Sequence, residues 1–392
     1  MIKSLPFLLV ISLLTCCIEV DMSIPSFPDI AEYFNISEAL TQMTIAVNFF
    51  GFCLSSIVYG PLSDSYGRRS VMLYGNAIMT LGACICALAN NIEILLFARF
   101  IQGLGASTSA VVAFAVIADS YSADKSAKII GIMNSMITIF MSAAPIAGGF
   151  INEAVGWRGS YIIIAVISLT SWVLLYFRLP ETNTNKFVFI SKNILQNFKQ
   201  IIFDRKFIYS SLAPSLIYAG WMSFVACGAF LYTGVYGLSI IKYTLHQGAV
   251  ISVFSLFSFY CFRVHNLLGQ KRSIISGIIL MLGGGIIMTV TSLSYAKAPY
   301  LTTVSMMIYS IGSAISYPII FTKSLDIYPN LKGTSSSLIM SVRALLCSLF
   351  ISLSSYFYDD SLTSIAFVIL IIVLIYMFLI IKLLKIPSFD IN

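Results

Sequence analysis

Long apolar runs separated by polar segments are the main pattern of this chain. A helix that crosses a bilayer needs about 20 apolar residues, and twelve runs approach or exceed that length. They predict an all-α, polytopic membrane protein with twelve transmembrane helices. The predicted spans are 4–27, 40–60, 70–89, 93–118, 127–151, 158–178, 207–232, 244–264, 273–295, 299–322, 333–357 and 362–384.

Composition supports a membrane protein and argues against a nucleic-acid partner. The 392 residues are 58% hydrophobic and only 10% charged, whereas soluble domains contain about 25% charged residues. The formal net charge is +7, but the basic residues lie in short loops between apolar runs and do not gather on one domain face. We expect a monomer embedded in lipid.

Lysine and arginine are distributed unevenly between alternate loops. With the N-terminus inside, 18 of the 23 fall in inner segments and three in outer segments, while Arg99 and Arg343 lie within spans. Because cytoplasmic loops are rich in these residues, both termini are predicted to be cytoplasmic. Glu19 and Asp21 interrupt the first apolar run, so we expect a retained helix there instead of a cleaved signal peptide.

A central polar stretch divides the spans six and six. We predict an N-terminal bundle at 1–179, a cytoplasmic linker at 180–206 and a C-terminal bundle at 207–392. The loop after the eighth span, 267–272, contains a glycine and two cations, like the loop at 60–69 in the first half. This weak sequence similarity at corresponding positions of the two halves indicates two parallel repeats.

Metal and nucleotide chemistry are not expected. All eight cysteines lie inside apolar runs, where they act as small apolar fillers. The two histidines lie far apart in the sequence, and no phosphate-binding G-x-x-x-x-G-K-[ST] loop occurs. We therefore predict no metal, no cofactor and no direct use of ATP.

The segment 60–69 carries the most specific motif. It reads Gly-Pro-Leu-Ser-Asp-Ser-Tyr-Gly-Arg-Arg between two spans. It resembles the loop 2–3 signature of the major facilitator superfamily, G-x-L-[SA]-D-x-x-G-R-[RK], at every fixed position. The residues that carry this resemblance are Gly60, Asp64, Gly67, Arg68 and Arg69.

Further motifs resemble one branch of that superfamily. The first span ends Asp21-Met-Ser-Ile-Pro-Ser-Phe-Pro, and the fourth opens Arg99-Phe-Ile-Gln-Gly-Leu-Gly-Ala. The segments 179–182 and 333–337 also resemble segments that are typical of this branch. Together they resemble the drug:proton antiporter group, Bcr/CflA (bicyclomycin-resistance) branch. The resemblance implies two pseudo-symmetric six-helix bundles and proton-driven efflux across a bacterial inner membrane.

The fifth span departs from the antiporter pattern at one position. The family motif ends G-P-x-x-G-G, whereas this chain has Ala144 before Pro145 and keeps Gly148 and Gly149. The resemblance implies a role in antiport, and close helix packing is the alternative explanation for the two glycines.

Charges inside spans need a reason, because each costs about 2.5–3.5 kcal/mol on insertion scales. Four occur, at Glu19, Asp21, Arg99 and Arg343. Asp21 and Arg99 lie at matching predicted depths, about 9 Å below the outer surface. Opposite sign at equal depth makes them candidate ion-pair partners.

The two acids of the first span compete for one role. Glu19 lies about 200° around the helix from Asp21 and shares its face with Ser12, Thr15 and Ser23, a polar stripe that suits a water-filled cavity. The family ending instead favours Asp21. We assign proton coupling to Asp21 and substrate contact to Glu19, with the reverse as the alternative.

Two further sites follow from the resemblance and from depth. The resemblance implies that Asp64 pairs with Arg68 and Asp119 near the start of the eleventh span, as a conformational latch. Arg343 lies about 15 Å into that span, near the bilayer midplane. Its candidate partners are Glu19, backbone carbonyls or an anionic group of the substrate.

The leading prediction is a proton-coupled exporter of small molecules that works by alternating access. A proton-coupled importer of a metabolite is the alternative on the same fold. A polytopic membrane enzyme is less favoured, because no paired acids or histidines gather at one interface.

Overall fold

A computed structural model of the chain describes residues 5–183, 191–294, 297–328 and 331–386. Within these ranges the regular structure is helical throughout, in the order α1 (Leu5–Ser23), η1 (Ile24–Ser26), α2 (Phe27–Phe34), α3 (Glu38–Tyr66), α4 (Arg68–Leu88), α5 (Ile92–Ser120), α6 (Ala123–Val155), α7 (Trp157–Arg178), α8 (Ser191–Ile202), α9 (Arg205–Phe230), η2 (Leu231–Val235), α10 (Ile240–Leu268), α11 (Gln270–Ser294), α12 (Pro299–Asp326), α13 (Lys332–Phe357) and α14 (Leu362–Leu384).

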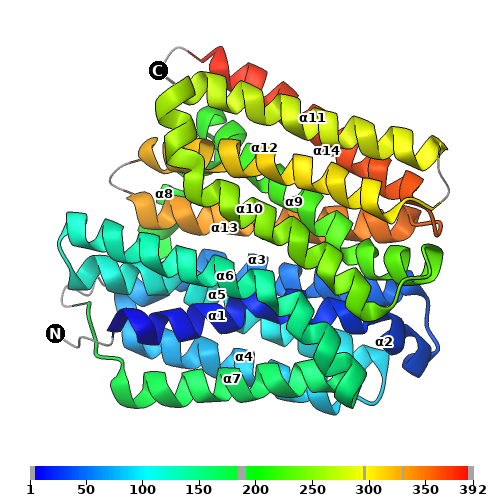
Figure 1. Ribbon diagram of the computed structural model, residues 1–392. Coiled ribbons are helices and arrows are strands. Elements are labelled where there is room, and N and C mark those ends of the chain that lie inside the picture. The colour runs from blue at the N-terminus through cyan, green and yellow to red at the C-terminus, as the bar shows by residue number, and fades with distance from the viewer. Residues whose placement is uncertain (1–4, 184–190, 295–296, 329–330, 387–392) are drawn as a thin grey trace.

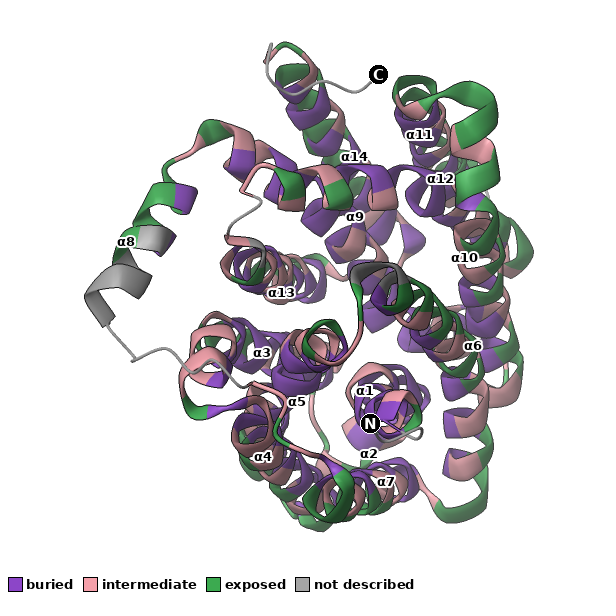
Figure 2. Ribbon diagram, turned by 90° about the vertical axis from the view of Figure 1, so that its left-hand side faces the viewer, coloured by how far each residue is buried: buried purple, intermediate pink, exposed green. Residues whose placement is uncertain are grey.

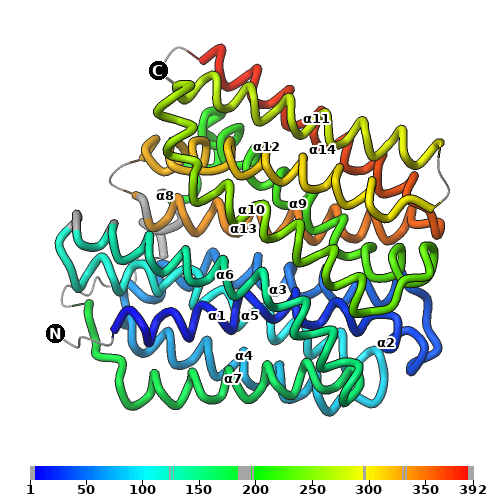
Figure 3. The backbone as a smooth tube through the Cα atoms, in the orientation of Figure 1, coloured from blue at the N-terminus to red at the C-terminus, as the bar shows by residue number. Residues whose placement is uncertain are grey.

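Twelve of the helices are long and apolar enough to cross a membrane, which confirms the predicted number of spans. They form two bundles of six: α1 with α3–α7, and α9–α14 (Figure 1). The start of α1, the end of α14 and α8 lie at one end of the molecule, which we call the terminal end, and the opposite end is called the far end (Figure 3). Many large apolar residues are exposed, and buried residues lie where the helices face one another (Figure 2).

The first span is longer than predicted. Helical structure continues beyond residue 27 through η1 and α2 to Phe34, so one nearly continuous element runs from Leu5 to Phe34. Pro25 and Pro28 each occupy the first turn of a new helical segment, where a missing N–H costs no hydrogen bond. The prolines therefore redirect the helix at the far end and do not terminate it.

The linker contains an element that was not predicted. Helix α8 lies between the two bundles in sequence, and its Phe198 and Ile201 pack against Phe207, Leu338 and Ile339. Apolar residues recur every three or four positions in Ser191–Ile202, so the signal for an amphipathic helix was present. Residues 184–190, also part of the predicted linker, lie outside the described residues.

Glycines make the tight turns that join corresponding helices in the two halves. Gly67 joins α3 to α4 with φ +100°, and Gly269 joins α10 to α11 with φ +77°. Only glycine adopts this region without steric cost. The equivalent position of these two turns supports the predicted repeat.

Candidate functional site

A buried ion pair lies inside the N-terminal bundle. Arg99 of α5 donates from Nη1 to Oε2 of Glu19 on α1 at 3.2 Å, and the two side chains are 0% and 2% exposed. Asn48 of α3 donates to the other Glu19 oxygen at 3.1 Å, and Arg99 also donates to Gln102 at 2.8 Å. These hydrogen bonds help to offset the cost of burying the pair, although Nε and Nη2 of Arg99 have no hydrogen-bond partner among the described residues.

Small residues of the fourth span bring this pair together. A Cβ at Gly103 would collide with the Asn48 backbone carbonyl of α3, and one at Gly105 would collide with α4 at Gly75 and Met79. Only glycine permits these approaches. The motif that begins at Arg99 thus holds α5 close to both neighbours, and the arginine points inward between them.

The predicted pair between Asp21 and Arg99 is wrong, because Arg99 binds Glu19. Glu19 lies two residues deeper than Asp21, about 3 Å along the helix, which the long arginine side chain spans easily. Rotation around α1 decides the partner: Glu19 faces α3 and α5, whereas Asp21 faces the space between the bundles.

The polar stripe of α1 faces the bundle interior along part of its length. Ser12 contacts Asn76 of α4 and Ser109 of α5, at 3.1 and 2.6 Å. Thr15 donates to the carbonyl of Ser12. Of the stripe, Glu19 borders a small cavity of about 90 Å³, together with Asp21, Asn48 and Arg343. The stripe therefore packs inside the bundle at Ser12 and reaches a cavity at Glu19.

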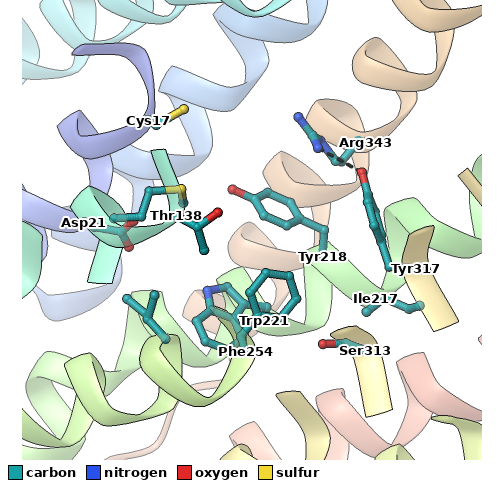
Figure 4. A pocket seen from close by; sticks show the side chains of 12 residues that line it. Cys17, Asp21, Thr138, Ile217, Tyr218, Trp221, Phe254, Ser313, Tyr317 and Arg343 are labelled. Carbon is teal, nitrogen blue, oxygen red and sulfur yellow. Dashed lines mark hydrogen bonds between the residues drawn. The ribbon is translucent and has the colours of Figure 1, made fainter. Parts of the chain in front are cut away.

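A larger cavity of about 250 Å³ lies between the two bundles (Figure 4). Both bundles supply its walls. The lining residues are Cys17 and Asp21 of α1, Thr138 and Met141 of α6, Ile217, Tyr218 and Trp221 of α9, Ile251 and Phe254 of α10, Ser313 and Tyr317 of α12, and Arg343 of α13.

Asp21 is the acid of this cavity. Its residue is 2% exposed, and its Oδ1 atom has no hydrogen-bond partner in the described part of the chain. It also borders the smaller cavity beside Glu19. A buried carboxyl oxygen without a protein partner is costly unless it carries or meets a proton, water or ligand.

Arg343 is the cation of the same cavity. Its Nη1 donates to the Tyr317 hydroxyl at 3.2 Å, and its guanidinium lies 4.8 Å from the centre of the Tyr218 ring. Among the described residues, no carboxylate pairs with it. Glu19, one predicted partner, is already paired with Arg99.

The C-terminal bundle contributes cavity residues that the sequence analysis missed. Tyr218, Trp221, Phe254 and Tyr317 bring four aromatic side chains to the walls. Their spacing carried no usable signal, because the chain has 29 phenylalanines and 21 tyrosines spread over all spans.

The loop 60–69 forms a compact charge cluster at the terminal end. Arg68 pairs with Asp64, four residues earlier, and donates from Nε to Asp119 at the end of α5 at 2.9 Å. The structure thus brings together the three residues that the resemblance implied. We call Asp64, Arg68 and Asp119 the loop charge cluster.

Two neighbours anchor this loop to the sixth span. Arg69 donates to the carbonyls of Leu179 and Tyr176 at 2.9 and 2.8 Å. Glu181 accepts from the Arg68 amide at 2.9 Å, at the N-terminus of α4, where a negative charge is favoured. The segment 179–182 therefore caps the N-terminus of α4.

Gly60 allows the end of α3 to lie against α13 of the C-terminal bundle. A Cβ at this position would lie 2.5 Å from the Ser337 hydroxyl of α13. Further along the same helices, the Ser341 hydroxyl donates to the Cys53 carbonyl at 3.0 Å. Helices α3 and α13 thus stay in close contact across the bundle boundary.

The fifth-span motif makes two close contacts of different kinds. Pro145 lies inside α6. A Cβ at Gly148 would collide with the Met22 carbonyl of α1 within the bundle, and one at Gly149 would lie 2.7 Å from Thr244 of α10 in the other bundle. Close packing accounts for both glycines, and Gly149 places the motif at a boundary between bundles.

In the described part of the chain, no three histidine, cysteine or acidic side chains gather in a way that would hold a metal ion.

Comparisons with known proteins agree with this architecture. The chain is similar to a bicyclomycin resistance protein homolog of Haemophilus influenzae (27% identity, covering 83% of this chain and 82% of the relative). It is also similar to the multidrug transporter MdfA of Edwardsiella ictaluri (25% identity, covering 86% of this chain and 82% of the relative). Its fold matches the partially occluded, inward-open xylose transporter XylE of E. coli (TM-score 0.73, 16% identity, 98% of each chain). The Major Facilitator Superfamily profile matches residues 9–351, and the chain belongs to that family.

Proposed function

We propose that this protein exports small amphipathic molecules from a bacterial cell in exchange for protons. The observation that carries the proposal is Asp21, a buried carboxylate with an unpartnered oxygen that faces a cavity between two bundles. The relatives named for bicyclomycin and multidrug resistance support export as the direction. An acid whose surroundings change between two states of a carrier takes up a proton in one state and releases it in the other.

The assignment of the two first-span acids follows from their contacts. Glu19 is neutralised by Arg99 and held by Asn48, so it has a structural partner in this state. Asp21 has no such cation, and it borders both cavities. We therefore assign the proton to Asp21 and treat the Glu19–Arg99 pair as the support that fixes α1 next to it.

Helix contacts between the bundles support alternating access. Helices α6 and α10 meet toward the far end, where Gly149 contacts Thr244 and Gly248 contacts Ile146. Toward the terminal end the two helices separate (Figure 1). We propose that the terminal end is cytoplasmic, that this state is closed at the far end, and that rocking of the bundles opens the far end instead.

We propose that the loop charge cluster stiffens the terminal end of α3, which already touches α13 in this state, and that it acts as a latch when the opposite state closes the terminal end. Asp64, Arg68 and Asp119 fix the end of α3 to the end of α5. Gly60, on the same end of α3, touches α13 of the other bundle. A rigid loop at this contact transmits movement of one bundle to the other. We also propose that the segment 180–206 is the linker between an N-terminal bundle at 1–179 and a C-terminal bundle at 207–392.

Purified protein in proteoliposomes tests this function. A panel of neutral, cationic, anionic and zwitterionic amphipaths is added while the internal pH is recorded. We expect the transport of at least one compound to drive protons across the membrane in the opposite direction. We expect Asp21→Asn to abolish this proton flux. The matched control is Glu32→Gln, because Glu32 is an exposed acid on α2 of the same span.

Two results would contradict the proposal. Protons that move in the same direction as the compound indicate an importer that works by symport. Full coupled flux in Asp21→Asn would remove Asp21 from the coupling step.

A further inference from the structure

We propose that the preferred cargo is an aromatic zwitterion, with an ammonium group that binds Asp21 and an anionic group that binds Arg343. This inference rests on the proposed export by proton exchange and names the substrate class of the same cavity. The charges come from different bundles: Asp21 from α1 and Arg343 from α13. In Figure 4 the two lie on opposite sides of the cavity, with the Tyr218 ring between them in this view.

Arg343 requires an anion that the described residues do not supply. A guanidinium is always charged and offers five N–H donors. One donor reaches the Tyr317 hydroxyl, and the Tyr218 ring lies beneath the charge. These contacts orient the group and leave its positive charge without a carboxylate in the described ranges. A carboxylate or phosphate entering the cavity would supply the missing partner.

The internal alternatives are occupied or too distant. Glu19 pairs with Arg99 and accepts from Asn48. Asp21 borders the same cavity as Arg343, yet no ion pair joins the two. The cavity therefore presents two separate charges of opposite sign, and a molecule with separated charges complements both.

Exchange for protons selects a zwitterion over a simple anion. A simple anion at Arg343 would bind best when Asp21 is protonated, which would couple cargo and proton in the same direction. An ammonium group at Asp21 competes with the proton instead, which gives exchange. The aromatic walls, from Tyr218, Trp221 and Phe254, favour a flat apolar body between the two charges.

Three matched naphthalene probes test the inference. The zwitterion is 6-(aminomethyl)-2-naphthoate, the anion is 6-methyl-2-naphthoate, and the cation is (6-methyl-2-naphthyl)methylamine. Equilibrium dialysis with the purified full-length protein gives their affinities, and proteoliposomes give the accompanying proton flux. We expect the zwitterion to bind tightest and to drive proton exchange.

Variants separate the two charges. Arg343→Gln should weaken the zwitterion and the anion by about tenfold or more, the usual worth of a charged hydrogen bond, and leave the amine unchanged. Asp21→Asn should weaken the zwitterion and the amine and strengthen the anion, because it removes the negative charge that disfavours an anion in the same cavity. Arg343→Lys keeps the charge and should retain most of the zwitterion affinity.

The matched control for Arg343 is Arg263→Gln. Arg263 also stacks on a tyrosine, at 5.2 Å from the Tyr260 ring, but is exposed outside the cavity. An unchanged zwitterion affinity in folded Arg343→Gln, a preference for the amine, or binding of none of the three probes overturns the inference. Proton exchange driven by other amphipaths in that same preparation would leave the proposed function standing, so the two failures are distinguishable.

Discussion

Removing either charge of the Glu19–Arg99 pair should destabilise the protein far more than removing both. At 3.2 Å and an effective dielectric constant of about 20, two unit charges attract by about 5 kcal/mol. Much of that attraction offsets the cost of burying both groups. A single substitution leaves the other charge buried and unpaired, so we expect Glu19→Gln or Arg99→Gln to cost about 3–5 kcal/mol each.

The double substitution Glu19→Gln/Arg99→Gln restores neutrality inside the bundle. Gln at position 19 keeps the length of Glu19 and can retain the hydrogen bond from Asn48, and Gln at position 99 removes the charge that would be left unpaired. The double variant should therefore be more stable than the sum of the single losses predicts, by about 2 kcal/mol or more. This difference is the coupling energy of the pair.

The chain offers a direct readout of unfolding. Five of its eight free cysteines, Cys53, Cys86, Cys227, Cys261 and Cys347, are buried. A thiol-reactive fluorophore therefore reports unfolding of the detergent-solubilised protein during a denaturant titration. Expression level in the membrane gives an independent measure for variants that insert poorly.

A second cycle serves as the control. Asp21→Asn combined with Arg99→Gln should give additive losses, because Asp21 does not pair with Arg99 in the structure. Additive losses for Glu19 and Arg99, or a coupling energy of similar size between Asp21 and Arg99, would refute the assignment of partners.

The remaining predictions concern the bundle boundary and the loop. Gly149→Leu would collide with α10 and should hold the far end open. A membrane-impermeant thiol reagent added outside should then label Cys17 in the cavity. The control is Gly131→Leu, on the same helix with open space around it, which should not increase this labelling. Gly67→Ala should lower the unfolding temperature, because φ +100° costs a non-glycine residue about 1–2 kcal/mol; an unchanged melting curve would contradict this. Asp119→Asn should slow turnover and leave cargo affinity unchanged, and the reverse pattern would argue against a latch.

The sequence alone was sufficient for the membrane architecture. A bilayer demands long apolar helices whose backbone groups are satisfied internally, so length and hydropathy predicted all twelve spans. The loop charge cluster was also accessible from sequence, in part for a local reason: Asp64 and Arg68 are four residues apart at the end of a helix and meet directly. Helix α8 was accessible as well, through the spacing of its apolar residues.

The tertiary structure alone decided the partners inside the spans. Depth could not distinguish Glu19 from Asp21 as the partner of Arg99, because the two acids differ by about 3 Å in height and the arginine side chain is long. The angle at which α1 packs against α5, α6 and α7 made that choice. The cavity aromatics and the open charge of Arg343 depend likewise on how two bundles, distant in sequence, face each other across a boundary that no local pattern encodes.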